Sequence, residues 1–326
     1  MRMKALAARA PGGPETLELV DVDAPAPAPG EILVKVAACG LNPVDYKIRM
    51  GYFSEGRRYP AVYGWDVAGV VDRAGEGVTG FAPGDRVFYF APLGAPGAYA
   101  EYHTVAASLA APMSSALSFA EAAPLPLAGN TAYQALLRRA DLKPEETVLI
   151  IGAAGGVGSL AVQLAAWRGA RVIGVCSTGN MEYVSSLGAS EVIDYTARDV
   201  NAEVPRLTGG VGVDVAFDLV GGAGFSQAAA ALRPHGRLVF LNAFTRDYDK
   251  AMAAVNAARL KNLDLHCMIV QPEGGVMRAL ARLAERGFLK PQVDRVIPLT
   301  GVAEAHRRLE TMHGRGKIVI DMGLPC

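Results

Sequence analysis

The sequence predicts an α/β protein of two domains, one rich in β-strands and one built on a doubly wound parallel sheet. Three observations support this prediction. Short β-branched or alternating runs dominate residues 1–122, whereas apolar runs alternate with helix-compatible segments from residue 123 onward. Residues 152–158 contain four glycines in seven positions, directly after an apolar run. The length of 326 residues exceeds what one small core needs, which favours two domains.

The balanced charge and the cysteine spacing argue against several classes of binding partner and site. Lys and Arg together number 32, as do Asp and Glu, so we expect neither nucleic acid nor a membrane as a partner. The N-terminal residues lack the long apolar segment of a signal peptide, so we expect a cytoplasmic protein. No CxxC pair occurs, which argues against a disulfide framework and a structural zinc lobe. The four cysteines are Cys39, Cys176, Cys267 and Cys326.

Residues 1–122 carry the β pattern, with expected strands at 31–37, 67–72 and 85–90 between turn signals. Within this domain, residues 39–47 concentrate reactive side chains: a carboxamide, a carboxylate, a phenol and an amine. These candidate catalytic residues are Asn42, Asp45, Tyr46 and Lys47. An ordinary polar turn, initiated by Asn-Pro, is the alternative interpretation of the same segment.

The glycine-rich segment is the strongest local motif. Residues 148–151 form an apolar run typical of a buried parallel strand, and apolar residues recur at helical spacing from Val157 onward. Strand, glycine turn and helix in this order make a dinucleotide-binding (Rossmann) fingerprint, here Ala153-x-Gly155-x-x-Gly158. Backbone N–H groups at the helix N-terminus would hold a pyrophosphate. The expected contacts are Ala154, Gly155, Gly156 and Val157.

Two other interpretations of this segment stay open. Residues 148–167 carry no charge and have about the length of a membrane span, although the glycines would break such a span midway. A purely structural glycine turn is the second alternative, because a lone fingerprint is a weak motif. The regular series of strands on either side favours the nucleotide site over both.

The middle of the chain fits a doubly wound sheet, with a ligand at the carboxyl ends of its strands. Its expected strands are the apolar runs 148–151, 171–175, 191–194, 213–220, 237–243 and 263–269. From residue 272 we expect a return to the first domain, with helices at 276–285 and 302–312 and strands at 293–299 and 317–321. The predicted domains are therefore 1–122 with 272–326, and 123–271.

The end of the second strand in this sheet indicates which cofactor binds. An NAD site usually places an acid about 20 residues beyond the glycine motif, to hold the ribose 2′-hydroxyl. Here no acid occurs before Glu182, whereas Ser177, Thr178 and Asn180 can donate hydrogen bonds to a 2′-phosphate. We therefore expect NADPH. Helix capping by Ser177 and Thr178 is an alternative role that is compatible with this one.

The order of motifs along the chain resembles the medium-chain dehydrogenase/reductase superfamily, and within it the zinc-less quinone oxidoreductase (zeta-crystallin-like) branch. The resemblance covers essentially the whole chain. The segments that carry it are Gly40–Asp45, Tyr59–Val71, Gly84–Val87, Gly97–Glu101, Gly129–Tyr133, Gly152–Gly158 and Gly316–Ile320. It implies a GroES-like catalytic domain, a Rossmann NADP-binding domain and a homodimer formed through the edge strand at 263–269.

The resemblance also adds cofactor contacts. Thr131 matches the position that meets the nicotinamide end, while Tyr195 and Lys317 match residues that approach the 2′-phosphate. Three residues at the ends of the fourth and fifth strands are candidates to line the same site, although core packing is an alternative role for the first two. They are Val220, Leu241 and Asn242.

Departures from the family pattern argue against a metal. Zinc-dependent relatives place a cysteine where Asn42 stands and a His-Glu pair where Trp65 and Asp66 stand. Catalytic zinc normally takes three protein ligands of the His, Cys or carboxylate type, which Asn42 and Trp65 cannot supply. The five histidines form no ligand cluster in the sequence, so we expect no metal.

These features predict NADPH-dependent hydride transfer to a quinone or an α,β-unsaturated carbonyl. Without zinc as a Lewis acid, a conjugated acceptor is favoured because it delocalises the incoming charge itself. We expect Asn42 to donate to the developing oxyanion and Tyr46 to donate a proton, with Lys47 lowering the pKa of Tyr46 or orienting it. Alternatives are a nucleotide-binding redox sensor or structural protein and, less favoured, a zinc alcohol dehydrogenase.

Overall fold

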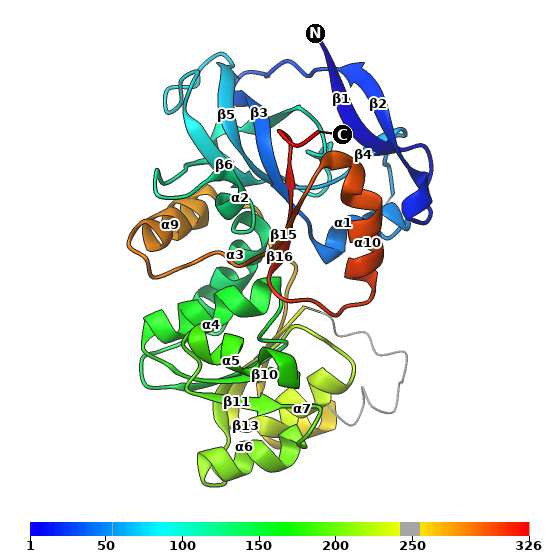
Figure 1. Cartoon of the computed structure of the whole chain (residues 1–326). Coiled ribbons are helices and arrows are strands. Elements are labelled where there is room, and N and C mark those ends of the chain that lie inside the picture. Colours follow the sequence, from blue (N-terminus) through cyan, green and yellow to red (C-terminus); the bar gives the residue numbers. More distant parts are fainter. Residues whose placement is uncertain (54, 242–254, 326) are drawn as a thin grey trace. The chain divides into compact units, whose positions relative to one another are not determined.

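The computed structural model describes residues 1–53, 55–241 and 255–325, and it divides into two compact units (Figure 1). Unit one comprises Met1–Asn130 together with Gln271–Cys326, and unit two comprises Thr131–Val270. The chain therefore leaves unit one after its first third and returns to it at the end. The first division falls inside helix α3 (Pro126–Tyr133), a few residues after the boundary at 122/123 that the sequence suggests.

Unit one is built on two β-sheets, as the strand pattern of the first third predicts. The larger sheet has seven strands, β3 (Glu31–Gly40), β5 (Asp66–Ala74), β6 (Arg86–Phe90), β7 (Tyr102–Ala106), β8 (Ala111–Pro112), β15 (Val293–Ile297) and β16 (Lys317–Asp321). The smaller has three, β1 (Arg2–Ala8), β2 (Leu17–Asp23) and β4 (Ala61–Val62). Strand β16 pairs antiparallel with β3, with Val319 opposite Gly40. This pairing brings the C-terminal segment beside the candidate catalytic loop.

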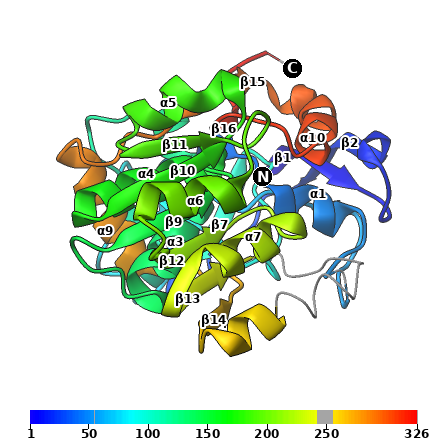
Figure 2. The ribbon, with the colours of Figure 1, turned by 90° about the horizontal axis from the view of Figure 1, so that it is seen from below.

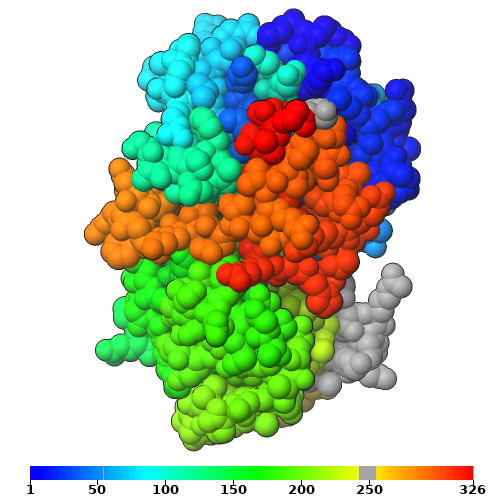
Figure 3. All heavy atoms as spheres, in the orientation of Figure 1, coloured from blue at the N-terminus to red at the C-terminus, as the bar shows by residue number. Residues whose placement is uncertain are grey.

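Helices complete unit one. They are α1 (Pro43–Arg49), α2 (Phe119–Ala122), α9 (Gly274–Glu285), α10 (Val302–Glu310) and part of α3. Helix α9 buries an apolar stripe that includes Val276 and Leu280, as its 3.6-residue spacing predicts. Figure 3 shows α9 and α10, in orange tones, at the surface of this unit. Residues 43–47, expected as loop, belong to α1, which is too short for helical periodicity to stand out in the sequence.

Unit two contains the predicted doubly wound sheet. Its six strands are all parallel and run in the order β11-β10-β9-β12-β13-β14, with the topological switch between β9 and β12. The strands are β9 (Thr147–Ile151), β10 (Arg171–Cys176), β11 (Glu191–Asp194), β12 (Val213–Asp218), β13 (Leu232–Phe240) and β14 (Asp264–Cys267). The predicted fold class is confirmed.

Helices cover both faces of this sheet (Figure 2). They are α4 (Gly156–Arg168), α5 (Met181–Ser186), α6 (Val200–Thr208) and α7 (Ala223–Ala231). Because side chains alternate along a strand, β10 contacts different helices on its two faces. Ile173 and Val175 belong to one core with residues of α6 and α7, whereas Gly174 faces Val184 of α5. Burial on both faces explains why the central strands β9 and β10 are largely continuous apolar runs.

Short helical turns link these elements. Unit one has 3-10 turns at Pro14–Thr16, Ala107–Leu109 and Leu299–Gly301, and unit two has one at Thr178–Asn180 and a π-helical turn at Gln134–Arg139. In the described part of the chain, no helix is long and apolar enough to cross a bilayer. Residues 148–167 form strand β9, the glycine turn and most of helix α4, in place of a span.

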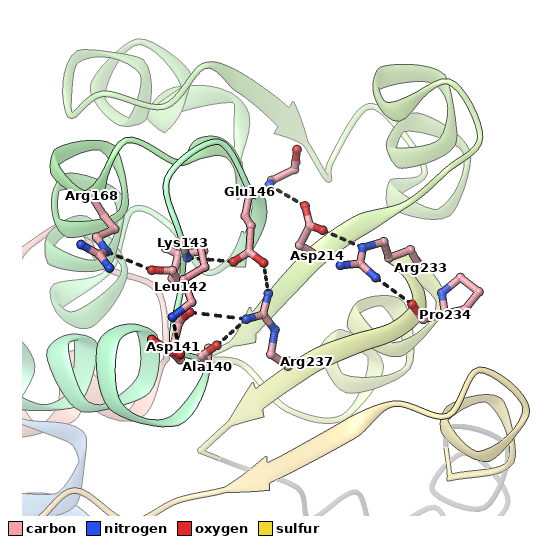
Figure 4. Close-up of polar contacts among 11 residues, drawn as sticks. Ala140, Asp141, Leu142, Lys143, Glu146, Arg168, Asp214, Arg233, Pro234 and Arg237 are labelled. Carbon is pink, nitrogen blue, oxygen red and sulfur yellow. Dashed lines mark hydrogen bonds and ion pairs between the residues drawn. The ribbon is translucent and has the colours of Figure 1, made fainter.

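A network of charged side chains joins the amino-terminal ends of the strands in unit two (Figure 4). Asp214 accepts a hydrogen bond from the Thr147 amide at 2.8 Å and pairs with Arg233 at 2.6 Å. Arg237 pairs with Glu146 and donates to the carbonyl of Ala140 at 2.7 Å. These contacts fix the amino-terminal ends of the strands, at the end of the sheet opposite to the glycine turn.

Candidate functional site

The glycine turn lies between β9 and α4, and its conformation requires its glycines at two positions. Gly152 has φ of +85°, in the left-handed region that residues with a Cβ rarely adopt. A Cβ on Gly158 would lie 2.1 Å from the carbonyl oxygen of Gly152, so helix and strand pack too closely there for any side chain. Gly155 caps α4, and a Cβ there would meet only the Gly152 oxygen, at 3.5 Å. The free N–H groups of α4 at this turn suit a pyrophosphate.

The carboxyl ends of β10 and β11 bring several polar side chains together. The side-chain Nδ2 of Asn180 donates to the Ser177 hydroxyl at 3.1 Å, and the Thr178 hydroxyl donates to Asp194 at 2.6 Å. Hydrogen bonds from the Thr178 and Thr196 hydroxyls lower the pKa of Asp194. Asp194 is not expected from the sequence pattern, because the acid that usually binds the ribose follows the second strand, whereas Asp194 ends the third. The two residues end neighbouring parallel strands, and the register places Asp194 beside Cys176.

The remaining cofactor candidates of unit two lie in different environments. Tyr195 is half exposed directly after β11, and Val220 is exposed after β12. Leu241 follows β13 and is partly buried, while Thr131 is buried in α3. Asn242 lies outside the described residues. At the end of β12, the buried carboxylate of Asp218 accepts from the amides of Val220 at 3.0 Å and Gly221 at 3.1 Å, which shapes the turn.

In unit one, the candidate catalytic loop is the N-terminus of helix α1. Asn42 is the N-cap residue and Pro43 is the first helical residue, where its missing N–H costs nothing. The Asp45 carboxylate accepts from the Asn42 amide at 2.8 Å, which satisfies one donor at the helix start. The Asn42 side chain is buried, and its Nδ2 donates to Asp66 Oδ2 at 2.8 Å.

The position of Lys317 differs from the expectation that this residue approaches the 2′-phosphate of the cofactor. Its side chain is buried, and its Nζ donates to the Leu41 carbonyl at 2.6 Å, to Asn42 Oδ1 and to Asp66 Oδ2 at 3.1 Å. All three N–H donors of the ammonium are thus used inside unit one. Lys317 is therefore a partner of Asp66 and not an available contact for a 2′-phosphate. Burial raises the pKa of Asp66, and the Lys317 charge opposes that rise.

The expected oxyanion role of Asn42 is also corrected. Its Oδ1 accepts from Lys317, and its Nδ2 donates to Asp66 and lies 3.4 Å from the Gly40 carbonyl. A carboxamide carries two N–H donors, and both point at protein oxygens here. Asn42 consequently fixes the start of α1 and does not present a donor to a substrate oxygen.

Asp45 is the end of a buried series of hydrogen bonds that also includes Tyr99, His306 and Arg49. The Tyr99 hydroxyl donates to Asp45 Oδ2 at 2.7 Å and lies 3.3 Å from His306 Nε2. Arg49 Nε donates to His306 Nδ1 at 3.2 Å, and Arg49 also pairs with Glu310. Since an arginine can only donate, Nδ1 is the acceptor, which places the His306 proton on Nε2, facing Tyr99. Burial and then the Arg49 charge lower the pKa of His306 to about 3.

Tyr46 and Lys47 do not interact as predicted. Burial, followed by the charge of Glu310, raises the pKa of Tyr46, and Lys47 contributes no lowering. The expectation that Lys47 lowers the pKa of Tyr46 was wrong. Tyr46 keeps its proton at neutral pH.

Asp45 makes stability depend on pH. Its folded pKa is raised by burial to about 7, whereas an unfolded aspartate titrates near ~3.9. Between these values the folded chain holds a proton that the unfolded chain has released, so this residue's contribution to the free energy of unfolding falls as pH rises. We expect the stability difference between the wild type and Asp45→Asn to decline from pH 4 to pH 7 in urea titrations. A difference that stays constant over this range would contradict the assignment.

The residues at positions 42, 65 and 66 do not fit a zinc ion. The Asn42 carboxamide and the Asp66 carboxylate are already bound to the Lys317 ammonium. The Trp65 side chain is fully buried and donates its indole N–H to the Ala95 carbonyl at 3.2 Å. Among residues 1–53, 55–241 and 255–325, no group of three or more His, Cys, Asp or Glu side chains could hold a metal.

Comparison with known proteins agrees with this architecture. Residues 28–115 match the family described as alcohol dehydrogenase GroES-like domain, and residues 187–320 match the family described as zinc-binding dehydrogenase. The human quinone oxidoreductase is 32% identical, and the match covers 94% of this chain and 92% of that protein. The 2-methylene-furan-3-one reductase of Solanum lycopersicum is 35% identical, over 89% of this chain and 71% of the relative.

A solved structure shares the whole fold. The quinone oxidoreductase of Coxiella burnetii superposes with a TM-score of 0.88 at 33% identity, covering 99% of this chain and 100% of that one. Identity above 30% over nearly the full length, together with the GroES-like and doubly wound units, decides the family. The chain belongs to the quinone oxidoreductase (zeta-crystallin-like) branch of the medium-chain dehydrogenase/reductase superfamily.

Proposed function

We propose that this protein is a zinc-independent, NADPH-dependent oxidoreductase that reduces a quinone or an α,β-unsaturated carbonyl. The observation that carries this proposal is the cluster of Asn42, Asp66 and Lys317, in which an ammonium binds the side chains at two of the positions where zinc-dependent relatives carry the residues of their metal site. Without a Lewis acid, the acceptor must delocalise the incoming negative charge itself. The names of the human and tomato relatives, a quinone oxidoreductase and a furanone reductase, support an acceptor of this class.

The cofactor part of the proposal rests on unit two. When bound, the reduced nicotinamide supplies a hydride. The glycine turn and the N-terminus of α4 hold the pyrophosphate through backbone N–H groups. The end of β10 carries no acid, and the Ser177 hydroxyl, whose oxygen accepts from Asn180, keeps its own proton for a 2′-phosphate. Tyr195 is half exposed and its backbone N–H donates to the Cys176 carbonyl at 3.1 Å, beside Ser177, so its phenol can add a further donor. Thr131, Val220 and Leu241 remain candidates for the nicotinamide end.

Proton delivery in this scheme falls to Tyr46. The phenol of Tyr46 holds its proton at neutral pH and can give it to an enolate, although burial raises its pKa and so makes it a weaker acid than an exposed tyrosine. Helix α1 holds Tyr46 firmly, because the helix start is fixed through Lys317 and through the Asp45–Tyr99–His306 chain. Asp45 and Asn42 thus position the loop, while Lys47, whose pKa burial lowers, is a further proton-carrying group on α1.

Replacing Tyr46 by phenylalanine tests the proton donor. We expect kcat for an enone to fall about tenfold, at the low end for loss of a general acid, because water also protonates an enolate. The binding of NADPH should not change, since Tyr46 belongs to unit one. Steady-state rates and a solvent isotope effect measure the outcome, with Tyr52→Phe as the matched control. Unchanged turnover of both enones and quinones removes Tyr46 from the mechanism.

A substrate panel tests the function itself. Purified protein is mixed with NADPH or NADH and with 1,4-benzoquinone, 1,2-naphthoquinone, 2-alkenals or cyclic enones, and the absorbance of the reduced cofactor is followed. We expect oxidation of NADPH with at least one quinone or enone, and retention of activity after treatment with a strong chelator. Cofactor binding without turnover of any acceptor identifies a nucleotide-binding sensor or structural protein instead.

Assembly and location complete the proposal. Strand β14 is an outer strand of the sheet in unit two, and Leu265 and Ile269 expose apolar surface on or after it. Open apolar edges invite pairing, so we propose a homodimer that joins the two sheets through β14. We also propose a cytoplasmic location, because the free thiols of Cys39, Cys176 and Cys267 suit a reducing compartment.

A further inference from the structure

Asp194 brings a carboxylate to the edge of the sheet where the cofactor ribose is expected. It is the last residue of β11 and lies opposite Cys176, the last residue of β10. Its side chain is buried and directed at the hydroxyls of Thr178 and Thr196, each at 2.6 Å. Thr178 directly follows Ser177, at the strand end where dinucleotide-binding sheets read the 2′-position. The Asp194 carboxylate is thus hydrogen-bonded to Thr178, a residue of the surface where the ribose is expected.

In the cluster of Thr178, Thr196 and Asp194, both hydroxyl protons are already used in hydrogen bonds within the cluster. Thr178 and Thr196 own one hydroxyl proton each. Three short contacts compete for these two protons: each threonine oxygen with Asp194, and the two threonine oxygens with each other at 2.8 Å. An ionised carboxylate can only accept, so it contributes no proton. Both threonines therefore present lone pairs, and no donor, to a ligand.

Such a surface distinguishes the two cofactors. The ribose 2′-hydroxyl of NADH is a donor and can give a hydrogen bond to a threonine oxygen. The 2′-phosphate of NADPH is an anion with acceptor oxygens, which lone pairs and a nearby negative charge both oppose. Hydrogen bonds from both threonines lower the pKa of Asp194, so the carboxylate stays ionised throughout the neutral range.

We propose that Asp194 is a selectivity-determining residue that restrains NADPH binding and keeps NADH acceptable to the same site. The inference rests on the proposed function and refines it: Ser177, Asn180 and Tyr195 favour the 2′-phosphate, and Asp194 opposes it through Thr178. Asp194 acts through the threonines and is not a catalytic residue.

The Asp194→Asn variant tests this proposal. The new carboxamide has nearly the same shape, carries no charge and can donate to Thr178, whose own proton then turns toward the ligand. We expect the dissociation constant of NADH, divided by that of NADPH, to rise about tenfold, which means a relative gain in NADPH binding. This is the size expected for one hydrogen bond to a charged group. Fluorescence of the bound dihydronicotinamide measures both constants, and the kcat/KM ratio gives a second readout.

The matched control is Glu191→Gln, which removes one negative charge from the opposite end of the same strand. Glu191 pairs with Arg171 and lies away from the threonines, so the cofactor ratio should stay at the wild-type value. Thermal unfolding of both variants verifies that unit two is folded. An unchanged ratio in folded Asp194→Asn, or an equal shift in the control, overturns the role of Asp194.

This design separates two kinds of failure. If neither NADPH nor NADH binds the wild type, the proposed function fails, whatever Asp194 does. If both bind and the ratio does not respond to Asp194→Asn, only the selectivity role fails. A wild type that binds both cofactors within about a hundredfold of each other, and a variant shifted toward NADPH, support both statements.

Discussion

Replacing Lys317 by methionine lowers the free energy of unfolding by about 3–5 kcal/mol, the usual cost of leaving one member of a buried ion pair without its partner. Methionine fills most of the lysine volume but removes the ammonium that three oxygens share. Asp66 would then be fully buried and would keep the hydrogen bonds from Asn42 and the Leu127 amide, but it would lose the neutralising charge of Lys317. Urea denaturation followed by circular dichroism measures the loss.

A double variant identifies the cause. Adding Asp66→Asn to Lys317→Met removes both charges, so much of the lost stability should return, and Asp66→Asn alone should cost more than it does in the pair. If the costs of the two single variants simply add, the charges do not interact and the assignment fails. The same samples report on the site: turnover should fall with Lys317→Met because the start of α1 loses its anchor, while NADPH binding to unit two persists.

Gly158→Ala should be the most damaging single-methyl change in unit two. The added Cβ would meet the Gly152 oxygen at 2.1 Å and the Ala153 Cα at 2.8 Å, and backbone atoms cannot move aside as a flexible side chain can. We expect a loss of about 3 kcal/mol in stability from overpacking. We expect about a 100-fold loss of NADPH affinity, because the displaced turn misaligns the N–H groups of α4. Calorimetric titration with NADPH measures the affinity.

Gly155→Ala is the matched comparison within the same turn. Its Cβ would meet only the Gly152 oxygen at 3.5 Å, an ordinary contact, so the protein should fold with nearly wild-type stability. Any loss of NADPH affinity in this variant therefore reports on the approach of the pyrophosphate to the backbone. If Gly158→Ala binds NADPH as tightly as the wild type, the turn is structural and the cofactor lies elsewhere.

The fold was predictable because its signals are local. The central strands β9 and β10 are buried on both faces, so each one is largely a continuous apolar run, and the glycine turn lies between a strand and a helix. Helix α1 was missed because seven residues that begin with Asn-Pro resemble a turn more than a periodic helix. Burial of its side chains depends on tertiary neighbours that no window of sequence contains.

The site was less predictable because its decisive contacts join distant parts of the chain. Lys317 meets Asn42 across a separation of 275 residues, through the pairing of β16 with β3, and this contact reverses the roles expected for both. The same holds for Asp194, which reaches Thr178 only because β11 lies beside β10. Residue type and spacing identify most of the relevant side chains, but they do not predict which of these side chains form hydrogen bonds or ion pairs with one another.

The return of the chain to unit one has a consequence for its synthesis. Unit two is a continuous segment, so all of its strands leave the ribosome before β15 and β16 are made. Unit one needs β16 to complete its sheet and Lys317 to neutralise Asp66. Although domains generally fold in the order in which they emerge, here the middle of the chain can reach its native state while the N-terminal third still waits for its last strand. During translation, the unit with the glycine turn can therefore be complete before the unit that carries the candidate catalytic loop.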